Sequence, residues 1–195
     1  NCHHPDAKWL SSVCVVCENG ALDVTRYKHE LRTHSVKGDR RAMYFECITS
    51  TVVNINVTMQ RSCDLGYAPA QVYIGIRTGS IEAKVELFRL AAAQWDRNGL
   101  YYLAQFSDND SSKIVHYRSA AQLGHPESQF LYGSVGFRSV DVERYTWWFK
   151  ALNNGHRTAL SGLNGATKVF LKEQVHSRVV FELGSNWKPM IQGDV

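Results

Sequence analysis

The sequence predicts an all-α protein, a right-handed α-solenoid of about five to six short antiparallel helix pairs followed by a C-terminal capping helix. Three observations predict it: a turn residue that recurs at a near-constant interval, columns of small and large residues at fixed distances from that turn, and apolar positions at helical spacing in between. Because one short helix pair cannot bury its apolar face alone, such units have to stack on one another.

The recurring turn residue is glycine at most positions. We define six anchors of the repeat, at His3, Gly38, Gly66, Trp95, Gly124 and Gly155. The last four are separated by 29, 29 and 31 residues, and Gly38 lies 28 residues before Gly66. A glycine between two helical segments is the expected helix stop. The anchors therefore divide the chain into helix pairs.

Three columns of residues keep their distance from the anchors. Seven residues before them stand large side chains: Leu31, Met59, Phe88, Tyr117 and Trp148. Four residues after them stand small ones: Ala7, Ala42, Ala70, Gly99, Ser128 and Ala159. Nine residues after them are Ser12, Cys47, Gly75, Ala104 and Gly133. Small residues allow two helices to approach closely, and the large residue fills the gap to the next unit.

The repeat frame predicts where each helix lies. We expect helices near 5–16, 22–34, 39–49, 55–64, 68–78, 81–93, 97–106, 111–122, 126–136, 141–152 and 157–163, a capping helix over 166–183 and an irregular tail over 185–195. Residues 51–57 alternate like a strand, but the repeat requires a helix start there. We treat residues 1–195 as a single solenoid domain.

The clearest copy of the repeat runs from Ala120 to Gly133, with the sequence AAQLGHPESQFLYG. It has a pair of small residues, then Leu-Gly, then a small residue four positions later. This pattern resembles the Sel-one-like repeats, relatives of the tetratricopeptide repeat, from about His3 to about Leu163. The chain departs from that family in its shorter loops and in Trp95, which replaces an anchor glycine. The resemblance implies a protein-interaction scaffold or adaptor.

In the tetratricopeptide family that the chain resembles, the first helix of each pair lines a concave surface. Six residues after the anchors, on that helix, stand mostly aromatic residues: Trp9, Tyr44, Val72, Tyr101 and Phe130. Three and ten residues after the anchors stand further candidates, among them Arg41, Asn98 and Gln105. We predict a partner-binding groove from these side chains, because aromatic residues are good interface anchors. The alternative is that the aromatic residues pack the core. A structure in which Tyr44, Tyr101 and Phe130 are all fully buried would reject the groove.

Catalytic and metal-binding patterns are sparse. Cys14 and Cys17 have the spacing of half a zinc site, with Cys2 and His3 nearby, but no second pair follows at a readable distance. The ordinary alternative is two small hydrophobes on one buried helical turn. The sequence contains no nucleophile elbow, phosphate loop or dinucleotide fingerprint. We therefore predict no enzyme, no cofactor and no metal site, with a zinc or thiol enzyme as the rival hypothesis.

Net charge and cysteine content limit the kinds of partner and the compartment that we expect. The net charge is +4, and the densest basic cluster is Lys37, Arg40 and Arg41, which is sparse for a nucleic-acid surface. No apolar run is long enough to span a membrane. Five cysteines, an odd number, favour an intracellular location, although a secretory route stays open. We expect other proteins as partners. A structural subunit of a larger assembly, without a free groove, is the alternative.

Overall fold

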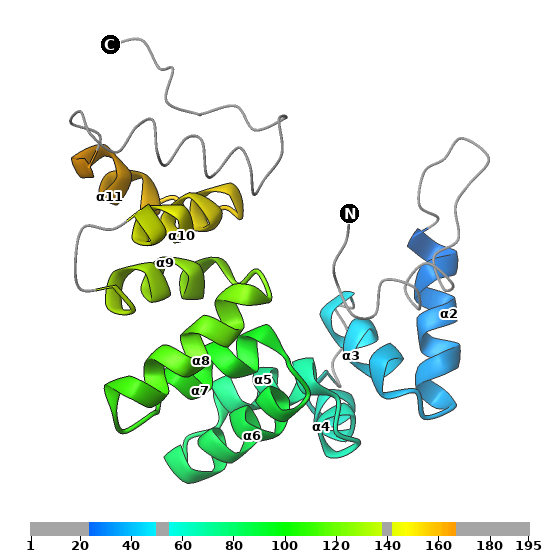
Figure 1. Ribbon diagram of the computed structural model, residues 1–195. Coiled ribbons are helices and arrows are strands. Elements are labelled where there is room, and N and C mark those ends of the chain that lie inside the picture. Colours follow the sequence, from blue (N-terminus) through cyan, green and yellow to red (C-terminus); the bar gives the residue numbers. More distant parts are fainter. Residues whose placement is uncertain (1–23, 50–54, 138–141, 167–195) are drawn as a thin grey trace. The chain divides into compact units, whose positions relative to one another are not determined.

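The computed structural model describes residues 24–49, 55–137 and 142–166, and ten helices without any strand lie in these ranges (Figure 1). The helices are α2 (Val24–Val36), α3 (Arg40–Thr49), α4 (Ile55–Asp64), α5 (Ala68–Arg77), α6 (Ile81–Ala93), α7 (Arg97–Gln105), α8 (Asp110–Gln122), α9 (Pro126–Val135), α10 (Val142–Asn153) and α11 (Ala159–Ala166). The predicted all-α repeat fold is confirmed. The strand-like pattern before α4 does not prevent a helix from starting at Ile55.

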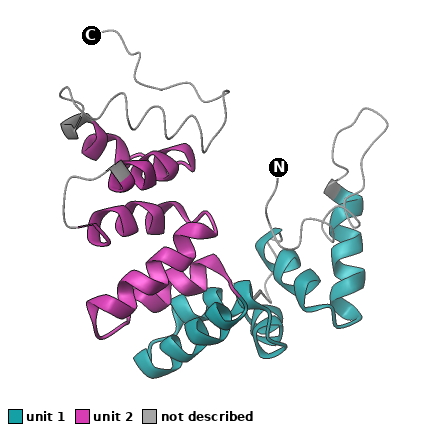
Figure 2. Cartoon of the chain, in the orientation of Figure 1, with its two compact units in different colours: residues 1–94 teal, residues 95–195 magenta. Residues whose placement is uncertain are grey.

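The chain divides into two compact units, residues 1–94 and residues 95–195 (Figure 2). The described helices α2–α6 belong to the first unit and α7–α11 to the second. Within each unit, consecutive helices pack on one another, as α5 does on α6 and α7 on α8. The single-domain assignment stays a prediction. The helix predicted for 5–16, the capping helix beyond residue 166 and the tail lie outside the described residues.

Every described anchor adopts the left-handed backbone conformation. The φ angles are positive at Gly38 (92°), Gly66 (77°), Trp95 (59°), Gly124 (80°) and Gly155 (94°). At Gly66 the turn closes α4, because the N–H of Tyr67 donates to the carbonyl of Ser62 at 3.1 Å. The N–H of Gly66 donates to the carbonyl of Cys63 at 2.8 Å in the same turn. Such paired bonds satisfy the last carbonyls of a helix.

The residue after each anchor often caps the next helix. The Asp96 carboxylate accepts hydrogen bonds from the N–H groups of Asn98 (3.0 Å) and Gly99 (2.8 Å) at the start of α7. His125 plays the same part for α9, where its Nδ1 accepts from the N–H of Ser128 at 3.1 Å. A helix stop and a helix start are thus joined within three residues, which makes the turns tight and fixes the repeat length.

The predicted columns form the core of each unit. Four residues after the anchors, the described side chains are fully buried, as at Ala42, Ala70 and Ser128. A Cβ on Gly75 would lie 2.7 Å from Cε1 of Phe88, and a Cβ on Gly133 would lie 2.7 Å from Cδ1 of Trp148. The small and large columns therefore contact each other, as the sequence predicts, and glycine is required where the approach is closest.

Candidate partner-binding surface

The first helix of each pair has one face in the core and one face outside it. The residues four and nine positions after the anchors are buried, whereas those three, six and ten positions after them keep exposed area in most repeats. Tyr44, Tyr101 and Phe130 are each half-buried, so the condition that would reject the groove is not met. Trp9 lies outside the described residues.

Each half-buried aromatic ring contacts a ring of the next repeat. Tyr101 stacks on His125, with ring centroids 4.5 Å apart, and Phe130 stacks on His156 at 4.7 Å. In the first unit, the rings of Tyr44 and Tyr67 meet edge to face at 5.3 Å. In each pair, one residue lies six positions after an anchor and the other directly follows the next anchor. These residues therefore hold adjacent repeats together as well as forming surface.

This supporting column was not predicted from the sequence. Its signal is nevertheless present in the described repeats, because Tyr67, His125 and His156 directly follow an anchor where the preceding repeat has an aromatic residue at the sixth position. The fourth instance fits the same rule, since Val72 is followed by Asp96 at the matching positions and neither is aromatic. The two columns vary together at these four junctions, whereas Trp9 in the first repeat is followed by Asp39 at the matching position.

His125 is held in its neutral form. Its burial is the main cause of a pKa lowered to about 4, and the charges of Arg97 and His156 lower it further. Its Nδ1 must also stay unprotonated to accept the hydrogen bond from Ser128 N–H. The imidazole is thus a structural part of the repeat junction, and its charge does not contribute to the surface near neutral pH.

His156 joins a carboxylate and a hydroxyl, which invites a catalytic interpretation. Its Nε2 lies 2.6 Å from Oε2 of Glu127, and the Thr158 hydroxyl lies 3.0 Å from Nδ1. However, that hydroxyl is also 3.3 Å from Nε2, so it lies between the two ring nitrogens and is not aligned with either lone pair. The geometry does not resemble an activated nucleophile. It connects α9 to the turn before α11.

The polar candidates Arg41, Asn98 and Gln105 differ in their exposure and in the contacts that they make. The Arg41 guanidinium forms an ion pair with Asp39, at 3.3 Å between Nη2 and Oδ2. Burial acts to raise the Asp39 pKa, but the hydrogen bonds and charge of Arg41 outweigh it, so the pKa of Asp39 is lowered. Asn98 is partly exposed, Gln105 is exposed, and a hydrogen bond links Gln105 to Tyr101. Asn98 and Gln105 are therefore the more available polar side chains.

Two exposed isoleucines stand at the equivalent first-helix positions of the first unit. Ile48 on α3 and Ile76 on α5 stand ten residues after their anchors and are 50% and 46% exposed. Beside Ile76, the Arg77 guanidinium covers the ring of Tyr73, with 3.6 Å between its Cζ and the ring centroid. The surface of the first unit is thus aliphatic, aromatic and cationic, whereas Asn98 and Gln105 make that of the second unit more polar.

The described residues give no support to a metal or thiol site. Among them, no group of three or more His, Cys, Asp or Glu side chains is placed to hold a metal ion. Cys47 and Cys63 are buried, and burial raises the pKa of each thiol to about 11. Cys14 and Cys17, the candidate zinc ligands, lie outside the described residues. No helix in the described ranges is long and apolar enough to cross a membrane.

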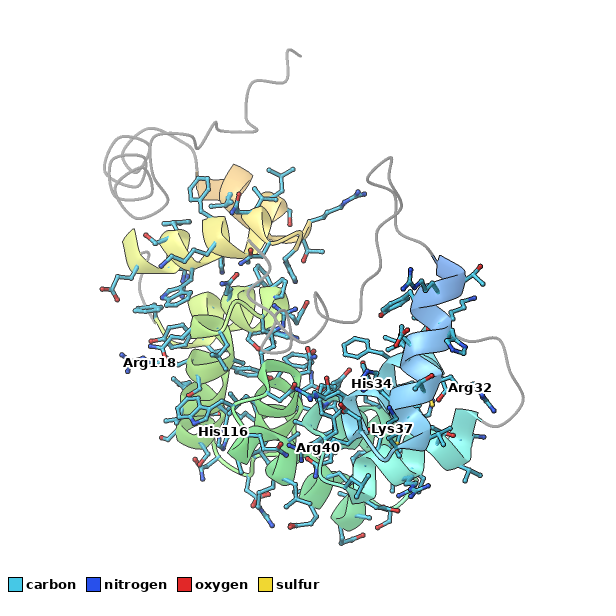
Figure 3. All side chains as sticks on the ribbon, turned by 90° about the vertical axis from the view of Figure 1, so that its right-hand side faces the viewer. Arg32, His34, Lys37, Arg40, His116 and Arg118 are labelled. Atoms are coloured by element: carbon cyan, nitrogen blue, oxygen red, sulfur yellow. The ribbon has the colours of Figure 1, made fainter. Side chains whose placement is uncertain are left out.

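Several basic side chains around α2 and α3 have structural partners. Arg32, His34, Lys37 and Arg40 come from α2, the turn after it and the start of α3, while His116 and Arg118 lie on α8 (Figure 3). Arg32 pairs with Glu46 at 2.9 Å. Arg40 donates from Nη1 to the carbonyls of Leu65 and Gly66, at 3.0 and 3.1 Å. These bonds explain part of the basic cluster without a nucleic-acid partner.

The fold and its repeated turns define an all-α helical-repeat protein, and comparison with solved structures shows that the fold is the Sel1-like repeat fold. A protective antigen of uropathogenic Escherichia coli that displays an SLR (Sel1-like repeat) fold matches with a TM-score of 0.65 and 19% identity over 84% of this chain. The match spans 42% of that antigen. A Sel1 repeat protein from Oxalobacter formigenes matches with a TM-score of 0.64 and 16% identity, covering 87% of this chain and 81% of the other. No protein-family model and no curated protein sequence matches the chain.

Proposed function

We propose that this protein is a non-enzymatic scaffold or adaptor that binds a segment of another protein on the first-helix surface. We use that name for the outward residues three, six and ten positions after the anchors, on α3 and α5 in the first unit and on α7 and α9 in the second, and each unit presents its own set. One observation carries the proposal. Large side chains on this surface stay half-exposed, although they occupy fixed places in a repeat whose neighbouring columns are fully buried. Exposed apolar groups in a repeated arrangement mark an interaction surface.

The chemistry of the surface suits a protein segment. Ile48 and Ile76 offer aliphatic contact at matching places in adjacent repeats of the first unit. Tyr101 and Phe130 are already fixed by stacking, so they lose little conformational freedom when a partner binds. Asn98 and Gln105 can hydrogen-bond a peptide backbone, which has both donors and acceptors.

The test uses substitutions that change the exposed contacts and spare the packing. The full chain serves as bait in native cell extract, beside the variants Ile48→Ser/Ile76→Ser and Asn98→Arg/Gln105→Arg. A Val115→Ser/Arg118→Ser variant on the exposed side of α8 is the matched control. Thermal melting first establishes that all variants fold. We expect a bound protein that is lost from at least one first-helix variant and kept by the control. Retention by both first-helix variants contradicts the proposal.

A structural subunit of a larger assembly is the second candidate, and one observation favours it. Val57 near the start of α4 and Ile81 at the start of α6 are well exposed, and both lie in the first turn of the second helix of a pair. A partner that packs against this edge would leave the first-helix surface free. In that case a Val57→Ser/Ile81→Ser variant loses the bound protein, while both first-helix variants retain it.

A further inference from the structure

Trp95 occupies a backbone conformation that every other described anchor gives to glycine. Its φ is 59°, in the left-handed region, where a side chain with a Cβ costs roughly 1–2 kcal/mol. The side chain is 68% exposed, so burial of the ring does not compensate for much of that cost. Strained residues of this kind concentrate at functional sites. The strain, the exposure and the departure from the repeat point to the same residue.

Arg97, two residues further on, holds unused hydrogen-bond donors. Its Nη1 lies 4.0 Å from the position that a Cβ on Gly124 would take, so it reaches over the turn between α8 and α9. Arg40 has the matching place in the first unit, and its guanidinium donates to the carbonyls of Leu65 and Gly66. In the described part of the chain, no hydrogen bond or ion pair engages the Arg97 guanidinium.

An exposed apolar side chain lies near Trp95 and Arg97. Leu123, directly before Gly124, is exposed and lies at the turn that Arg97 reaches. Asp96 stands between Trp95 and Arg97 in the chain, and its carboxylate accepts the N–H groups at the start of α7. An indole, a guanidinium and an aliphatic side chain are thus presented on neighbouring turns. Tryptophan and arginine are the residue types most enriched at interaction hot spots.

We propose that Trp95, Arg97 and Leu123 bind a short acidic and apolar segment of a partner protein. A carboxylate of the segment pairs with Arg97, where a planar bidentate bond is available, and a neighbouring apolar side chain packs on the Trp95 indole. A single-stranded nucleic acid could also stack on the indole, but one cation beside Asp96 is too few for phosphate-driven binding. This site lies on the turns and does not depend on the first-helix surface.

The decisive variant is Trp95→Gly, because it separates folding from binding. Glycine relieves the backbone strain, so the variant should melt at the same temperature as the natural chain or higher, yet it lacks the indole. The probe is a displayed library of random peptides, selected on the full chain. The strongest binder is then synthesised with a fluorescent label and titrated by anisotropy. We expect it to carry Asp or Glu beside Leu, Ile or an aromatic residue.

The affinity changes test each contact. We expect Trp95→Gly to weaken the peptide about tenfold or more, and Arg97→Gln about threefold to tenfold. Replacing the peptide carboxylates by amides should then cost little further in Arg97→Gln, as a double-mutant cycle shows. Val115→Ser, an uncharged change at an exposed position on α8, is the control and should bind the peptide normally. The proposal is overturned if no acidic peptide is selected, if Trp95→Gly binds equally well, or if a poly-dT oligonucleotide binds through Trp95 more tightly than the peptide.

Discussion

His125 supports the ring of Tyr101 from the next repeat, at 4.5 Å between centroids, and the same imidazole caps α9 through Nδ1. One side chain therefore serves both the stacking of repeats and the start of a helix. Both roles depend on the neutral imidazole, which burial and the Arg97 and His156 charges favour. The junction is in consequence sensitive to proton concentration.

The first prediction follows from that sensitivity. The pKa of His125 is about 4 in the folded chain and about 6.5 in the unfolded chain, so the unfolded state binds more protons between these values. The free energy of unfolding should be constant above about pH 6.5, fall as the pH is lowered towards 4, and level off below that for this group. The loss should be on the order of 2 kcal/mol, because the partly exposed ring is screened by water.

Urea denaturation across this pH range measures the effect. The His125→Asn variant is the control, because asparagine also caps helices but does not titrate. The difference in unfolding free energy between the two proteins should shrink or reverse in sign as the pH falls. A difference that stays constant between pH 7 and pH 4 would contradict the role given to the imidazole.

The second prediction concerns the glycines that face large side chains. Gly75→Ala should destabilise the chain by about 1–3 kcal/mol, because the new methyl group would lie 2.7 Å from Phe88. The intrinsic helix propensity of alanine works the other way by about 1 kcal/mol, and steric overlap outweighs it. Gly79→Ala is the matched control, since a Cβ there meets nothing within 4 Å. Equal melting temperatures for the two variants would show that α5 and α6 shift apart at no cost.

The repeat explains which features could be predicted from the sequence. The anchors, the buried columns and most helix ends follow from residue type, because only small residues permit the close approach seen at Gly75 and glycine is favoured at positive φ. The register even places Trp95 in the left-handed region, which its residue type argues against. The repeat is thus stronger evidence than local propensity.

The proposed binding surface was harder to predict from the sequence for a physical reason. An aromatic column at repeat spacing fits either core or surface, and Tyr101 belongs to both, because its ring stacks on His125 while the side chain stays only half-buried. Arg41 pairs with Asp39, only two residues away. The sequence does not show this ion pair, because an aspartate at that position can equally well cap the helix, and in the structure it does both. Contacts between repeats could not be predicted in this way, because the distance between two residues in the sequence does not determine whether their side chains meet.

The third prediction tests the hydrogen bonds of a buried amide side chain. Gln129 is almost fully buried, donates to the carbonyl of Ala121 at 3.1 Å and accepts from Nδ2 of Asn154 at 2.9 Å. Gln129→Met keeps the side-chain volume but leaves the carbonyl without that donor and Asn154 without its acceptor. The loss should be about 1–3 kcal/mol in the free energy of unfolding. Gln122→Met, at an exposed position on α8, should change it by less than about 0.5 kcal/mol.

The fourth prediction separates the two roles of Tyr101. Tyr101→Phe keeps the ring on His125 and removes only the hydroxyl, so the free energy of unfolding should change by less than about 1 kcal/mol. Tyr101→Ala removes the stacked ring and should cost about 2–4 kcal/mol. Combined with His125→Ala, it should give a coupling energy of about 1 kcal/mol, since the two rings are in contact. If the coupling energy is zero, the stacking does not join the repeats. If Tyr101→Phe folds normally but loses the protein bound by the natural chain, the hydroxyl belongs to the binding surface, because stacking on His125 is unchanged in that variant.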